Sequence, residues 1–163
     1  MLKVIVNSTP LIVLCGIGRL DILQKLYCEI IIPTAVYQEV TAIEDSACSQ
    51  IKSAGQWIHV EQIREQTEKK MYKAKLHDGE VEVMILAQEK KADLLILDDN
   101  AAKKTAKYLG LTVTGTLGIL IKAKQQGIID EIYPLLSEMK QNGFYIAPEL
   151  ESVVLEQAGE RCK

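Results

Sequence analysis

The residues with the clearest chemical potential follow the segment LLIL, residues 94–97, where Asp98 and Asp99 stand side by side. Two further acids, Glu39 and Glu80, occur in segments with helical spacing. Carboxylates brought within a few ångströms of one another repel, and a site that keeps them ionised needs a compensating cation. Hard oxygen ligands without an adjacent His or Cys favour Mg²⁺ or Mn²⁺, and such an ion is suited to phosphodiester hydrolysis.

Each acid also has a structural alternative. Asp98 or Asp99 could cap the helix that follows, because Asp is a favoured N-cap residue, and successive strand residues point to opposite faces, so at most one is expected to enter a site. Glu80 lies in the first turn of a predicted helix, where any acid gains from the helix dipole, and Glu82 is a weaker competitor for its role. Glu39 could be an exposed helical residue. Spacing alone leaves both interpretations open.

The elements that must position these acids alternate along the chain. Short runs that are apolar on both faces are typical of a parallel sheet covered by helices, and they are separated here by segments with helical spacing. Such alternation predicts an α/β fold with right-handed crossovers. The four runs are residues 4–6, 29–32, 94–97 and 111–114.

Polar residues follow these runs, at the edge of an open parallel sheet where ligands bind. Asn7, Ser8 and Thr9 follow the first run, and Thr116 follows the fourth. Asn7 offers a carbonyl oxygen or an amide but no charge. Thr116 opens a predicted helix, whose start can bind a phosphate oxygen.

Composition and charge limit the class of protein. With 163 residues, of which 48% are hydrophobic and 25% charged, the chain is expected to form one domain with an aliphatic core over residues 1–163. A net charge of -3 argues against a globally basic nucleic-acid-binding surface, without excluding a local basic rim. The cysteines lack metal or disulfide spacing, which favours a reducing cytoplasm. No apolar stretch approaches ~18 residues, so no membrane association is predicted.

Two segments stand apart in composition. Residues 61–78 are polar and predict a surface helix or arm, and residues 148–163 predict an exposed helical tail. Lysines in the arm and after the aspartates could bind the phosphates of a substrate, although a charged run is more often a solvated face. They are Lys69, Lys70, Lys73 and Lys75 in the arm, and Lys103, Lys104 and Lys107 after the aspartates.

The chain resembles PIN-domain proteins, in particular a prokaryotic branch related to VapC-type toxins, in four ordered blocks. They are VIVNSTPLI, IIPTAVYQEV, LHDGEVEVMILAQEKKADLLILDDNAAKKTAKYLGLTVTGTLGILIKAKQQGII and NGFYIAP, which together cover most of the sequence. The resemblance implies a PIN-like three-layer α/β/α sandwich with a central, mainly parallel sheet of four or five strands.

The resemblance also implies site residues. In that family four acidic positions hold a metal ion and cut RNA. The last three fall on Glu39, Glu80 and Asp99, with Asp98 adjacent, whereas the first falls on Asn7, an amide. The family's hydroxyl-bearing residues near the site suggest Ser8, Thr9 and Thr116 as further contacts.

Two functions therefore remain to be distinguished. One is a Mg²⁺- or Mn²⁺-dependent endoribonuclease, the toxin of a pair with a small antitoxin protein and commonly a homodimer. The other is a PIN-fold module that binds RNA or a partner protein with weakened or lost catalysis, because Asn7 removes one negative charge from the site. A phosphoacceptor receiver domain is disfavoured, since it needs an acidic pair where this chain has Asn7 and Ser8.

Overall fold

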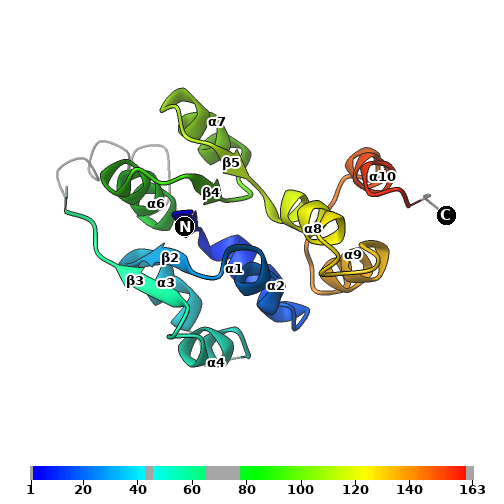
Figure 1. Ribbon diagram of the computed structural model, residues 1–163, viewed down its shortest axis with the longest axis horizontal. Helices are drawn as coiled ribbons and strands as arrows, with labels where there is room; N and C mark the ends of the chain where they lie inside the picture. The colour runs from blue at the N-terminus through cyan, green and yellow to red at the C-terminus, as the bar shows by residue number, and fades with distance from the viewer. Residues whose placement is uncertain (1, 43–45, 65–77, 161–163) are drawn as a thin grey trace.

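The computed structural model describes residues 2–42, 46–64 and 78–160. Within these ranges it confirms an α/β fold in which helices flank a central, five-stranded parallel sheet (Figure 1). Residues 65–77, most of the predicted polar arm, lie outside the described residues, and its four lysines lie there too.

The sheet has β1 at its centre and the order β3-β2-β1-β4-β5, with every described pairing parallel. Its register places Ile5 opposite Ile31 on one side and opposite Leu95 on the other. All three residues of β1 are buried, as expected for a strand covered on both faces. The strands are β1 (Val4–Val6), β2 (Ile30–Pro33), β3 (Ile58–Glu61), β4 (Leu94–Ile96) and β5 (Val113–Thr114).

The four predicted apolar runs all become strands, but the sequence did not predict β3. This edge strand is short, and only Ile58 is fully buried, while His59 and Val60 are exposed. Its IHVE sequence therefore carries no continuous apolar signal. Trp57, which precedes it, packs against the core.

Helices connect the strands, and their bounds follow the capping signals of the sequence. Pro148 begins the last helix, for example, and Gly127 follows α8 with a φ of 76°, a conformation that favours glycine. The described helices are α1 (Ser8–Gly16), α2 (Asp21–Tyr27), α3 (Thr34–Thr41), α4 (Ser46–Ser53), α6 (Asp78–Lys90), α7 (Asn100–Tyr108), α8 (Thr116–Gln125), α9 (Tyr133–Gln141) and α10 (Pro148–Gln157). None of them is long and apolar enough to cross a membrane.

Helix α6 is buried on all sides over residues 81–87. It packs against β1 and β2 of the sheet and against α3. A helix buried in this way holds its polar side chains at its ends or pairs them inside the protein. Glu80 and Glu82 are therefore carried by a helix whose position the packing of the core fixes.

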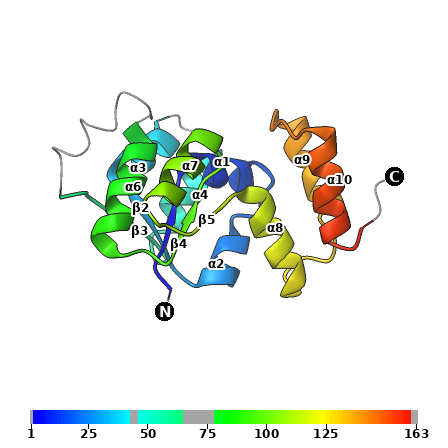
Figure 2. The ribbon, with the colours of Figure 1, turned by 90° about the horizontal axis from the view of Figure 1, so that it is seen from above.

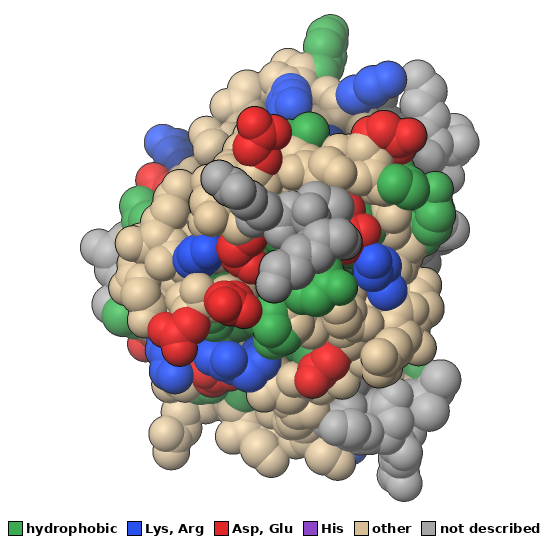
Figure 3. Space-filling model, turned by 90° about the vertical axis from the view of Figure 1, so that its right-hand side faces the viewer, with side chains coloured by type: hydrophobic (Ala, Val, Ile, Leu, Met, Phe, Trp, Pro, Cys, Tyr) green, Lys and Arg blue, Asp and Glu red, His purple; other side chains and the backbone are tan. Residues whose placement is uncertain are grey.

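Helices α8, α9 and α10 gather at one end of the molecule, beside the sheet (Figures 1 and 2). The tail was expected to be an exposed helix. Helix α10 does form, but Val154 and Leu155 are buried, because α10 packs against α8. The outer face of this end carries acidic, basic and apolar side chains interspersed (Figure 3).

Glu160, which follows α10, contacts residues of the same group of helices. Its carboxylate accepts hydrogen bonds from the backbone N–H groups of Ile132 and Tyr133, at 2.7 and 3.0 Å, and an ion pair from Lys124 at 3.0 Å. Burial raises the pKa of Glu160, but these donors together hold that pKa below its ordinary value. The carboxylate thus caps the start of α9.

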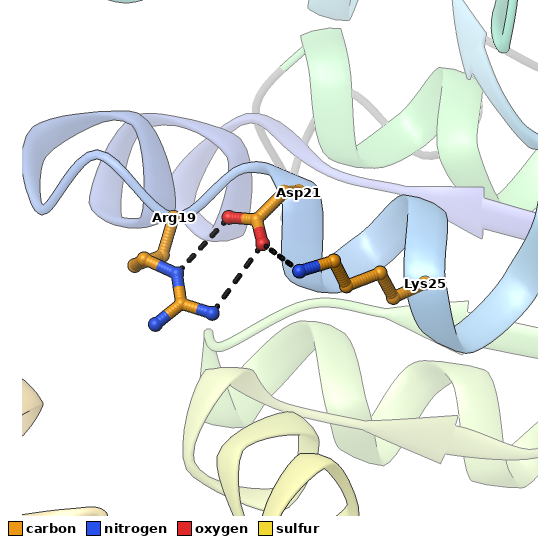
Figure 4. Close-up of polar contacts among 3 residues, drawn as sticks. All are labelled: Arg19, Asp21 and Lys25. Carbon is orange, nitrogen blue, oxygen red and sulfur yellow. Dashed lines mark hydrogen bonds and ion pairs between the residues drawn. The ribbon is translucent and has the colours of Figure 1, made fainter. Parts of the chain in front are cut away.

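Asp21 forms a second charged cluster, in the first turn of α2 (Figure 4). Arg19 Nε and Lys25 Nζ each lie 3.0 Å from its carboxylate oxygens. Burial raises the pKa of Asp21, and the two cations outweigh that effect, so the pKa lies below its ordinary value. The cluster links α2 to the turn that precedes it.

Candidate active site

Asn7 stands at the carboxyl end of the central strand. Its backbone N–H donates to the carbonyl of Ile96, at 2.9 Å, and extends the pairing of β1 with β4. Its side chain is 5% exposed and does not cap α1, although Asn7 is the N-cap residue. Among the described residues, Asn7 Oδ1 has no hydrogen-bond partner. An unsatisfied buried acceptor costs about 1–3 kcal/mol, so this oxygen is suited to a ligand.

Glu39 reaches the same place from α3. A Cβ atom built on Gly79, in the first turn of α6, would lie 3.1 Å from Glu39 Oε2 and 3.6 Å from Asn7 Oδ1. The two oxygens therefore flank one point beside the start of α6. Only a glycine leaves this space open, and the next residue of the helix is the half-buried Glu80.

The two aspartates after β4 are engaged in helix starts. Asp98 accepts hydrogen bonds from Thr116 N at 2.8 Å and from Thr116 Oγ1 at 2.6 Å, so it joins the end of β4 to the start of α8. Asp99 is exposed and accepts a hydrogen bond from Ala102 N at 2.9 Å, as the N-cap of α7. The capping role that the sequence left open for Asp98 or Asp99 thus falls to Asp99, and Asn100 is the first residue of the helix.

The predicted substrate contacts have different environments. Ser8 and Thr116 are buried, and Thr9 is exposed. Lys103 is half-buried, and a Cβ built on Gly115 would lie 2.8 Å from its Nζ and 2.7 Å from Asp98 Oδ1. The ammonium group of Lys103 therefore lies beside the first residues of α8.

The described residues contain no group of three or more His, Cys, Asp and Glu side chains arranged to hold a metal ion. The predicted ligands thus do not form one carboxylate cluster within that part of the chain. Asp98 and Asp99 accept hydrogen bonds at the starts of α8 and α7, and Asn7 is an amide. The remaining donor set still fits a hard divalent cation. Asn7 supplies an unpartnered, buried carbonyl oxygen and Glu39 supplies an exposed carboxylate. Between them is the gap that a Cβ on Gly79 would fill.

Sequence reasoning underrated one residue of this region. Glu82 is 6% exposed, and its Oε1 accepts a hydrogen bond from Ala35 N, at 3.1 Å, in the first turn of α3. The sequence offered it only as a weak competitor of Glu80. Its neighbours Val81 and Val83 are apolar, which was the one available signal that this acid enters the core.

A parallel sheet with an amide, a carboxylate and the start of α6 at the end of its central strand defines the class as an α/β protein with a polar site at the carboxyl end of its sheet. Residues 3–160 match the family model DUF3368, described as a PIN domain. The chain belongs to the PIN-domain family, whose members are typically nucleases that use divalent metal ions.

One solved structure with the same fold is a PilT N-terminus domain protein from the hyperthermophilic archaeon Sulfolobus solfataricus P2. It is 18% identical, the similarity covers 74% of this chain and 92% of that one, and the TM-score is 0.51. At this identity the similarity shows the fold alone. No curated protein matches the chain.

Proposed function

We propose that this PIN-domain protein is a metal-dependent endoribonuclease that uses Mg²⁺ or Mn²⁺. The observation that carries the proposal is the unpartnered, buried Asn7 Oδ1 beside the Glu39 carboxylate at the start of α6. Both oxygens are at the carboxyl end of the central parallel strand, where ligands of open α/β sheets bind.

Asn7, Glu39 and Glu80 would hold the ion. Bound there, it would polarise a phosphate oxygen and lower the pKa of an attacking water molecule. Asn7 gives a neutral carbonyl oxygen where a carboxylate would add charge, so a single ion held weakly is expected. Asp99 Oδ2 accepts the hydrogen bond from Ala102 N, so its other carboxylate oxygen is the one that could join this set while the cap is kept.

Lys103 and Thr116 are proposed as substrate contacts. The ammonium group of Lys103 lies beside Gly115 and the start of α8, so it would bind an RNA phosphate at that helix end. Asp98 orients Thr116 through two hydrogen bonds and thereby sets the position of the helix start. Ser8 and Thr9 follow Asn7 directly and are proposed as weaker contacts.

The resemblance to VapC-type toxins supports a finer proposal. The protein would act in the cytoplasm as the toxin of a type II toxin–antitoxin pair, with a small antitoxin protein as partner and a homodimer as its own assembly. A short gene beside this one that encodes a small antitoxin-like protein would support this role, and its absence would count against it.

A second candidate function is a PIN-fold module that binds RNA or a partner protein without cutting RNA. It is favoured by the amide at Asn7 and by the engagement of Asp98 and Asp99 in helix starts, which together reduce the negative charge available to a metal ion.

Calorimetric titration with Mn²⁺ separates the two candidates. The nuclease proposal predicts saturable binding and cleavage of single-stranded or structured RNA, both lost in Glu39→Gln, because that change removes the charged ligand without altering side-chain size. Glu149→Gln, at an exposed position in the first turn of α10, is the matched control and should keep both properties. No heat at millimolar Mn²⁺, or equal cleavage by the wild type and Glu39→Gln, would refute the nuclease proposal.

A further inference from the structure

Glu82 caps a helix far away in the sequence. Helix α3 lacks a cap of its own, since its N-cap residue, Pro33, has no side-chain donor or acceptor and makes no capping hydrogen bond. The Glu82 carboxylate from α6 supplies one by accepting the hydrogen bond from Ala35 N. A negative charge at this end of a helix is stabilised by the free N–H groups and by the helix dipole.

A second contact between the same helices lies one turn away. Along α3, Glu39 follows Ala35 by four residues, and along α6, Gly79 precedes Glu82 by three, so each pair shares one helix face. Glu82 meets Ala35, while Gly79 meets Glu39 and Val36. The two helices therefore pack in opposite directions with a register that these two contacts define.

This register determines where the Glu39 carboxylate lies. If α3 slid or rotated against α6, Glu39 Oε2 would leave the gap at Gly79 and move relative to Asn7 Oδ1. The Glu39 side chain is exposed and flexible, so its own rotamer does not fix the helix that carries it. The part-buried hydrogen bond from Ala35 N to Glu82 Oε1 is a polar contact that joins the two helices directly.

We infer that Glu82 is a positioning residue: its carboxylate locks α3 onto α6 and so holds Glu39 beside Asn7. The inference rests on the proposed function only in treating Glu39 and Asn7 as ligands of the ion. The placement of Glu39 by Glu82 can be measured without any metal.

The experiment compares Glu82→Ala with Glu160→Ala. Glu160 is a matched control, because it is also a largely buried carboxylate that caps a helix, but its helix is α9, which carries no candidate ligand. Both variants should lower the midpoint of chemical denaturation. Only Glu82→Ala should shift the side-chain amide resonances of Asn7 in a proton–nitrogen NMR spectrum and weaken Mn²⁺ binding by roughly tenfold or more.

Two further variants keep the test decisive. Glu82→Gln retains an acceptor oxygen, so it should keep the Asn7 resonances and stay within about threefold of the wild-type Mn²⁺ affinity. If Glu82→Ala fails to fold, Glu82→Asp is measured instead. The aspartate side chain is shorter, so either α3 moves toward α6 or the hydrogen bond from Ala35 N is lost.

The outcomes separate the two proposals. Unchanged Asn7 resonances in a folded Glu82→Ala or Glu82→Asp protein would overturn the positioning role, as would an equal shift in Glu160→Ala. If the wild type binds no Mn²⁺, the nuclease proposal fails, while the Asn7 resonances still decide whether Glu82 positions Glu39.

Discussion

Replacing Gly79 with alanine tests the site with one methyl group. The new Cβ would lie 3.1 Å from Glu39 Oε2, 3.5 Å from Val36 Cγ2 and 3.6 Å from Asn7 Oδ1. The first of these contacts is tighter than nine in ten Cβ contacts in proteins, so the Glu39 carboxylate must move by a few tenths of an ångström. It can do so, because it is the end of a flexible side chain, and the fold tolerates the change.

Stability and metal binding should therefore move in opposite directions. Alanine in place of glycine in a helix stabilises the folded state by about 0.4–1 kcal/mol, because the unfolded chain loses freedom. The new methyl group would displace the Glu39 carboxylate and stand between it and Asn7 Oδ1. The Kd for Mn²⁺ should therefore rise roughly tenfold, which corresponds to about 1.4 kcal/mol. Urea denaturation and calorimetric titration measure the two quantities.

Gly55→Ala is the control, because the nearest atom to its new Cβ, the carbonyl oxygen of Lys52, would be 3.9 Å away. It should leave Mn²⁺ affinity unchanged. If Gly79→Ala bound Mn²⁺ as tightly as the wild type and cleaved RNA at the same rate, Asn7 and Glu39 would not share an ion, and the assignment of the site would be wrong.

Three other predictions follow from the same contacts. Asn7→Asp places a second carboxylate near Glu39 in a buried position, so the metal-free protein should lose about 1–3 kcal/mol of unfolding free energy. Added Mn²⁺ should raise its melting temperature more than that of the wild type, and an equal rise in both would contradict this reasoning. Asp99→Asn keeps the cap on α7, so calorimetry should find Mn²⁺ affinity within about threefold of wild type, whereas a large loss would make Asp99 a ligand. The pKa of Glu160 is lowered in the folded protein, so the charged form of Glu160 stabilises the fold. This contribution is complete above the ordinary Glu pKa of about 4.3, and it is lost as pH falls through the lowered pKa. Glu160→Gln should thus cost about 1–2 kcal/mol in denaturation experiments at neutral pH, and the difference from the wild type should shrink as pH falls through the lowered pKa; a difference that did not depend on pH would show that charge is not involved.

The sequence predicts the parts of the fold that depend on local pattern. The apolar runs at β1, β2, β4 and β5 were recognisable because strands covered on both faces need continuous hydrophobicity. The edge strand β3 was not, since only Ile58 of its four residues is fully buried. The rule that polar residues gather beyond the carboxyl ends of parallel strands grouped Asn7 and Glu39, which are 32 residues apart in sequence, and in the structure an oxygen of each lies beside Gly79.

Long-range packing decides what the sequence could not predict. Asp98 and Asp99 look alike in sequence, yet one binds Thr116, 18 residues away, and the other caps its own helix. Glu82 becomes a cap only because α3 packs against α6, and its partner Ala35 is 47 residues earlier. Neither pairing leaves a local signal, because each depends on which face of a helix the rest of the core occupies.

The central place of β1 has a consequence for the order in which the protein is built during synthesis. Asn7 is made before Ile96, so its backbone N–H finds its acceptor only when Ile96 has been made. The gap beside Asn7 likewise awaits Gly79. A nascent chain that stops before Gly79 and Ile96 lacks the partners that place Asn7, so this end of the sheet takes its shape only after both residues have been made.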